Sequence, residues 1–167
     1  LFSALPGLAL ALLALLALPG CHSTEQPKHL IRVHLEGNPA VTSGFSVEHK
    51  LPLSKKVVHM HPRPVIPETE IIDARFFRGH LAPYVEIRLD DRGSRHLSYA
   101  MQANMGRSLY LVVNGLPMGY TLIDKVESDG TISFWLEVEE DNLESFSEDF
   151  KESIKRTQEI ANQNRWL

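Results

Sequence analysis

The first twenty residues carry no charged side chain, and Leu8 to Leu18 form an unbroken run of leucine and alanine. A helix that spans a bilayer needs about 20 apolar residues, whereas the apolar stretch of a signal peptide needs roughly 7–15. This run has 11 residues, and Pro19-Gly20 directly after it ends any helix. We therefore expect residues 1–20 to be a cleaved targeting segment, followed by one folded domain.

Cys21 is the only cysteine of the 167-residue chain, and it stands directly after this segment. Leu18-Pro19-Gly20-Cys21 resembles the lipobox of bacterial lipoproteins, with leucine at −3 and a small residue at −1. The resemblance implies acylation of Cys21 at the mature N-terminus. It also implies a body held by this lipid at the cell membrane or outer membrane, facing the periplasm. The alternatives are a leucine-rich core helix with a buried thiol and an uncleaved anchor.

The polar residues 21–28 are typical of a short tether. Residues 29–82 are expected to form a β-rich, extended portion of the domain. Alternating apolar and polar side chains predict strands at 29–35, 45–50 and 56–61. Three prolines between positions 62 and 67 then impose extended backbone. A further, irregular strand is expected over 71–77.

Residues 83–160 show a clearer order of elements. Strand 84–89 ends at Asp90, which is well placed to cap a helix that Gly106 ends. Asn114-Gly115 and Asp129-Gly130 are typical of hairpin turns between three further strands. An apolar stripe at helical spacing then predicts a long helix from Leu143. We predict an α+β fold, an antiparallel sheet with two helices packed on one face.

These capping and turn residues carry a resemblance to a known family. The stretches 85–94, with Asp90 and Gly93, 104–109, with Asn104 and Gly106, and 112–115 are similar to the head of the first periplasmic domain of SecD/SecDF protein-export membrane proteins. The resemblance covers roughly residues 83–155, and it carries no catalytic signature. It implies the fold of that head domain and a non-enzymatic role in which the domain contacts other proteins or peptides.

Composition narrows the function classes further. The net charge is −4, whereas proteins that bind nucleic acid present a strongly basic face, so no nucleic-acid partner is expected. A single cysteine excludes an internal disulfide framework and a multi-cysteine zinc site. We expect no cofactor.

The main alternative function is metal binding in the periplasm. His59 and His61 are two apart on a predicted strand, a spacing that metal sites use, and His49 on a neighbouring strand would be a third ligand. Exposed polar positions of a half-buried strand explain the same alternation. A hydrolase built on His96 with a nearby serine has no supporting motif, because no Gly-x-Ser-x-Gly elbow is present.

One surface of the predicted domain suits a peptide partner. The proline-rich stretch 62–67 would either accept an added peptide strand along its edge or connect two parts of the sheet rigidly.

Overall fold

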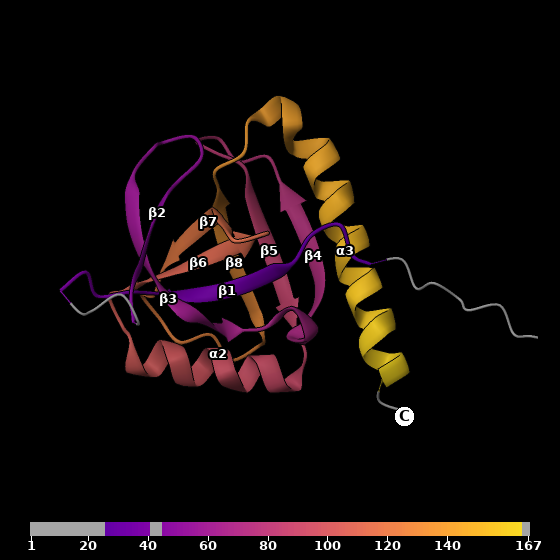
Figure 1. Ribbon diagram of the computed structural model, residues 1–167, viewed down its shortest axis with the longest axis horizontal. Helices are drawn as coiled ribbons and strands as arrows, with labels where there is room; N and C mark the ends of the chain where they lie inside the picture. Colours follow the sequence, from indigo (N-terminus) through magenta and orange to yellow (C-terminus); the bar gives the residue numbers. More distant parts are fainter. Residues whose placement is uncertain (1–25, 41–44, 165–167) are drawn as a thin grey trace, which may run out of the picture.

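The computed structural model describes residues 26–40 and 45–164. The expected targeting segment 1–20, with the lipobox-like residues Leu18, Pro19 and Gly20, and Cys21 lie outside the described residues. The strands are β1 (Ile31–Glu36), β2 (Val47–Lys50), β3 (Val57–Ile66), β4 (Ile71–Phe77), β5 (Tyr84–Leu89), β6 (Ser108–Val113), β7 (Leu116–Leu122) and β8 (Thr131–Leu136). The helices are α2 (Asp91–Ala103) and α3 (Leu143–Asn164), with short 3₁₀ turns η1 (Glu68–Glu70) and η2 (Glu140–Asn142) (Figure 1).

The described strands form one antiparallel sheet in the order β2-β3-β1-β6-β7-β8-β5-β4. The first strand of the domain, β1, lies between β3 and β6, and β4 pairs with β5. Both portions expected from the sequence, 29–82 and 83–160, therefore contribute to a single sheet. The α+β class predicted from the sequence is confirmed.

Both helices share one apolar core with the sheet. Alternate residues of a strand point to this inner face, as in β6, where Leu109, Leu111 and Val113 join the core. Leu97 and Met101 of α2 and the residues Phe150 and Ile154 of α3 belong to the same cluster. In Figure 1, α2 runs below the sheet and α3 along its β4 side.

Helix α2 begins as the capping pattern predicts. The Asp90 carboxylate accepts a hydrogen bond of 2.7 Å from the backbone N–H of Gly93. Gly93 itself sits against η1 and β5, since a Cβ there would lie 3.0 Å from the Cβ of Glu70 and 3.1 Å from that of Leu89. The first turn of α2 can approach the sheet this closely only because residue 93 has no side chain.

The Asn114-Gly115 turn joins β6 and β7 with both residues at positive φ, 52° and 83°, as a tight primed turn requires. The next connection differs from the expected tight hairpin. Strand β7 ends at Leu122, so residues 123–130 form a longer loop before β8, and the two strands pair at only two register positions. Gly130 nevertheless adopts the left-handed conformation expected of it, with φ 74°.

The proline-rich stretch belongs to β3 and is not a separate connector. Pro64 faces His34 of β1, and the register shifts on both sides of this pair. At the other end of β3, the hairpin with β2 turns over the outer face of the sheet. There Leu51, Val58 and Met60 pack on Tyr110 and Val112 in a second, smaller apolar cluster. The sheet is therefore covered on its inner face by helices and partly on its outer face by the β2–β3 hairpin.

Candidate functional site

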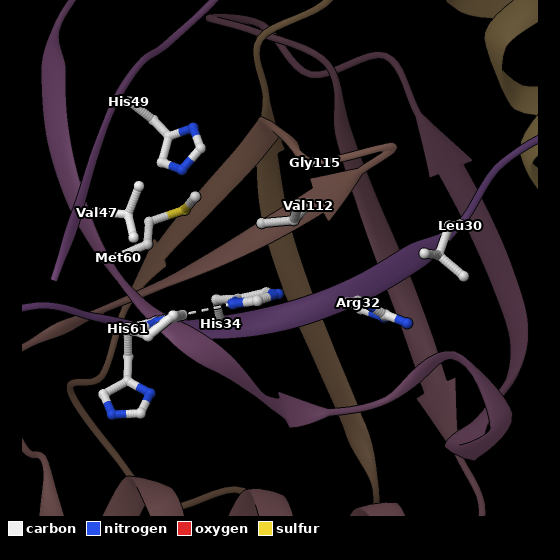
Figure 2. Close-up of a pocket in the computed structure, with 10 residues that line it drawn as sticks. Leu30, Arg32, His34, Val47, His49, Met60, His61, Val112 and Gly115 are labelled. Carbon is white, nitrogen blue, oxygen red and sulfur yellow. Dashed lines mark hydrogen bonds between the residues drawn. The ribbon is translucent and has the colours of Figure 1, made fainter. Parts of the chain in front are cut away.

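The three histidines of the metal alternative are not brought together. His49 faces Val58 across the β2–β3 ladder, whereas His59 faces Glu48. Because partners directly opposite one another share a face of the sheet, His49 and His59 lie on opposite faces. In Figure 2 the ring of His61 points away from the hollow that His49 faces. Over the described ranges, no group of three His, Cys, Asp or Glu residues is arranged to hold a metal ion.

A hollow of about 230 Å³ lies on the outer face between β1, β2 and β3. His34, which is buried, contributes to its wall, and its Nδ1 lies 2.9 Å from the backbone carbonyl of His61 (Figure 2). A carbonyl can only accept, so Nδ1 carries the proton and donates. Burial lowers the pKa of His34, and the positive charges of Arg32, His49 and His61 lower it further, while the bond to the carbonyl opposes the shift.

This pKa shift predicts a loss of stability in mild acid. The folded state holds His34 neutral, whereas the unfolded chain protonates it near its ordinary pKa of 6.5. The unfolded state then binds more protons, so the free energy of unfolding falls as pH drops below about 6.5, until the folded pKa is reached. Urea unfolding at pH 7.5 and 5.5 measures the change.

A matched pair of variants isolates His34 in this measurement. We expect H34N, whose amide can still donate to the carbonyl of His61, to lose less stability between the two pH values than the parent chain. The exposed His80, as H80N, should leave the pH dependence unaltered. A parent and an H34N variant with the same pH dependence would contradict the role of His34.

The serines near His96 do not make a nucleophile. Nδ1 of His96 lies 2.9 Å from the carboxylate of the buried Glu70. The hydroxyl of Ser94 donates to the carbonyl of Asp90 at 2.8 Å, and that of Ser98 to the carbonyl of Glu127 at 2.7 Å. These hydroxyls therefore cap backbone groups and do not face the imidazole.

The proline-rich part of β3 is a poor template for an added peptide strand. Strand β2 pairs with β3 only over Val57–Met60, which leaves residues 61–66 of β3 without a described partner on that side. Two residues of this stretch, Pro62 and Pro64, have no N–H to offer. The N–H of Arg63 already donates to Nδ1 of His61 at 3.2 Å. Such blocked groups are how natural sheets protect an edge.

The opposite edge of the sheet, β4, is blocked in a similar way. The carboxylate of Asp73 accepts from the N–H of Ala74 at 2.9 Å. From α3, the side-chain amide of Gln158 donates to the carbonyls of Ile71 at 2.8 Å and Thr69 at 3.0 Å. Both edges therefore have backbone groups that already bond to side chains of this chain.

The outer face carries a row of aromatic side chains that crosses five strands. The pairings Phe77–Tyr84, Tyr84–Trp135, Trp135–Tyr120 and Tyr120–Tyr110 are each directly opposite in the ladders from β4 to β6. We call these five residues the aromatic row. The rings of Phe77 and Tyr84 stack with centroids 4.8 Å apart, and that of Trp135 meets Tyr84 edge-on at 5.8 Å.

Solvent reaches much of this row. Trp135 is 44% exposed, Tyr120 39% and Phe77 36%, whereas Tyr110 is buried beneath the β2–β3 hairpin. At that end, a groove of about 340 Å³ lies between the hairpin and the row. The residues that line it are Leu51, Lys56, Val58, Ser108, Tyr110, Tyr120, Leu122 and Trp135.

The buried carboxylate of Glu137 holds the wall of this groove in place. It follows β8 and accepts from the N–H groups of Leu53 at 3.0 Å and Ser54 at 2.8 Å, and from the Ser54 hydroxyl at 3.0 Å. These three bonds fix the β2–β3 turn, which is 83–84 residues away in sequence, against the outer face. Hydrogen bonds to an ionised group are stronger than those between neutral groups.

Sequence reasoning did not find the aromatic row or Glu137. The alternation in strand 84–89 correctly puts Tyr84 and Val85 on opposite faces of that strand. In the same way, each ring of the row could be assigned to the polar face of its own strand. The row itself depends on the register of four strand pairs. Of these, β5 and β8 are distant from each other in the chain, and β7 and β8 are joined by a long loop. No local pattern contains that register.

The fold has counterparts among solved structures. No family model matches the chain, and no curated protein sequence matches it. SecDF in its super-membrane-facing form superposes with a TM-score of 0.53 at 13% sequence identity, over 76% of this chain and 18% of that one. A structure of SecDF, described as a membrane component that enhances protein export, gives a TM-score of 0.55 at 12% identity, over 83% of this chain and 71% of the other.

At these identities the likeness shows the fold, and the SecD-like fold expected from residues 85–115 is confirmed. This chain spans less than a fifth of the length of the first SecDF structure. Neither helix within the described part of the chain is both long and apolar enough to cross a bilayer.

Proposed function

We propose that this chain is a non-enzymatic protein of the cell envelope, anchored by lipid on Cys21, whose SecD-like domain contacts other proteins or peptides in support of protein export. The observation that carries the proposal is the fold that the domain shares with SecDF, a protein described as enhancing protein export. Two features of the chain agree with it. Leu18-Pro19-Gly20-Cys21 supplies a lipobox-like sequence, and the outer face of the sheet presents aromatic side chains to solvent.

The anchor is tested by removing the thiol. We expect C21S to move from the membrane fraction to the soluble periplasmic fraction, because each buried methylene of an acyl chain contributes about 0.8 kcal/mol to membrane binding. The body should stay folded, with the same thermal unfolding midpoint as the parent. Fractionation with metabolic palmitate labelling makes the measurement, and S23A is the control that should remain membrane-bound and labelled.

A C21S protein that stays in the membrane fraction would contradict lipid anchoring at this residue. Partner contact is tested separately, by crosslinking in intact cells and capture of the full chain. The proposal expects proteins among the covalent adducts.

A further inference from the structure

The aromatic row has the composition of a binding surface. Tyrosine and tryptophan are enriched where proteins contact partners, and exposed apolar patches on a folded domain mark interaction sites. The row crosses from β4 to β6, which is four inter-strand spacings of about 4.8 Å, or about 19 Å. An extended polypeptide rises about 3.3 Å per residue, so about six residues of a partner would cover it.

A group of unpaired acidic side chains lies at the same end of the sheet as Trp135. The chain leaves β8 one residue after Trp135 and passes into η2 and the start of α3, where the acidic side chains are exposed. We call four of them the acidic rim: Glu139, Glu140, Asp141 and Glu144. Since Glu139 is four residues from Trp135, their Cα atoms are at most about 14 Å apart.

None of the four rim carboxylates forms an ion pair with a described residue, and the carboxylate of Glu139 accepts a hydrogen bond from the side-chain amide of Asn142 at 3.3 Å. The rim favours the N-terminal end of α3 through the helix dipole. It also places four exposed negative charges close together in the chain. The groove beneath the β2–β3 hairpin carries a cation, Lys56.

We propose that the aromatic row and the acidic rim together form a docking surface for an extended, cationic polypeptide segment with apolar side chains. This inference rests on the proposed function, in which the domain contacts proteins or peptides. The apolar side chains of the segment lie on Trp135 and Tyr120 and enter the groove beneath the β2–β3 hairpin. Its basic residues lie at the rim. The acidic rim disfavours a nucleic acid, whose phosphates it would repel.

The experiment measures fluorescence anisotropy of labelled peptides mixed with the purified full chain. One peptide alternates leucine with serine and carries lysines at one end, and the matched peptide carries glutamates there. We expect the lysine peptide to bind at least tenfold more tightly, and its affinity to fall as salt is added. The double variant W135A/Y120A should lose tenfold or more in affinity, as truncated central aromatic residues do.

Matched variants separate the two parts of the surface. Y99A removes an aromatic side chain that is 69% exposed on α2 and should bind as the parent does. The rim variant E139Q/E140Q/E144Q should abolish the preference for the lysine peptide. The control E48Q/D124N/E152Q, which removes three exposed charges elsewhere, should keep that preference.

Equal binding of the two peptides, or equal affinity of W135A/Y120A and Y99A, would overturn the proposal. So would concentration-dependent self-association that W135A/Y120A abolishes, since the occupant of the row would then be a second copy of the chain. Near-UV circular dichroism of each variant confirms that the domain is folded. Because these affinities do not depend on acylation, their failure is distinguishable from retention of C21S in the membrane.

Discussion

Replacing Phe150 by alanine is expected to lower the free energy of unfolding by about 3–5 kcal/mol, as large-to-small changes of buried aromatic residues do. Phe150 is fully buried at the centre of the apolar face with which α3 packs on the sheet. Its ring meets that of Phe76 on β4 edge-on, with centroids 5.3 Å apart, and that of Phe146 at 5.7 Å. The alanine would leave a cavity between helix and sheet that these rings cannot fill.

Urea unfolding followed by far-UV circular dichroism measures this loss. The exposed Tyr99 provides the control. Y99A removes a ring of similar size that buries little surface, so the free energy of unfolding should change by less than about 0.5 kcal/mol. If F150A were as stable as Y99A, α3 would not be part of the cooperative core.

The second large loss of stability is expected when Glu137 is replaced. We expect E137A to lower the free energy of unfolding by about 1.5–3 kcal/mol, because it removes the charged acceptor of the Leu53 and Ser54 N–H groups. E137Q should cost less, since an amide oxygen still accepts. The loss should be local, because the carboxylate holds one turn and not the main core.

Hydrogen exchange gives the readout specific to this turn. The amides of Leu53 and Ser54 should lose protection in E137A, while that of Leu111 in the main core keeps its own. E139Q, at an exposed carboxylate two residues away, is the control and should leave both sets unaltered. Retained protection at Ser54 in E137A would show that the turn stands without the carboxylate.

Much of the local structure could be predicted from the sequence. Asp90 caps α2, and α3 begins at Leu143 as its apolar stripe indicates. Gly106 adopts the expected positive φ of 80°, but α2 already ends at Ala103, so Gly106 belongs to the turn after the helix. Strand 71–77 was expected to be irregular, and β4 does contain a register shift between Ile71 and Asp73. Each of these features depends on residues within a few positions of one another.

Other features needed contacts between distant parts of the chain. The proline-rich stretch became the second half of β3 because β1 pairs with it, although Pro64 cannot donate to the ladder. The expected hairpin at Asp129-Gly130 became a longer loop because β8 pairs mainly with β5, which lies on its other side. His49 and His59 lie on opposite faces of the sheet because of the register in which β2 pairs with β3.

The sequence by itself determined the apolar segment before Cys21, the elements of the domain and the SecD-like order of its caps and turns. These depend on hydrophobic periodicity and on the backbone preferences of single residues, which act over a few positions. Only the tertiary structure decided the strand order, the aromatic row and the attachment of Glu137 to a turn more than 80 residues away. The reason is that a strand pattern specifies which side chains share a face of its own strand, whereas long-range pairing specifies which strand and which register lie beside it.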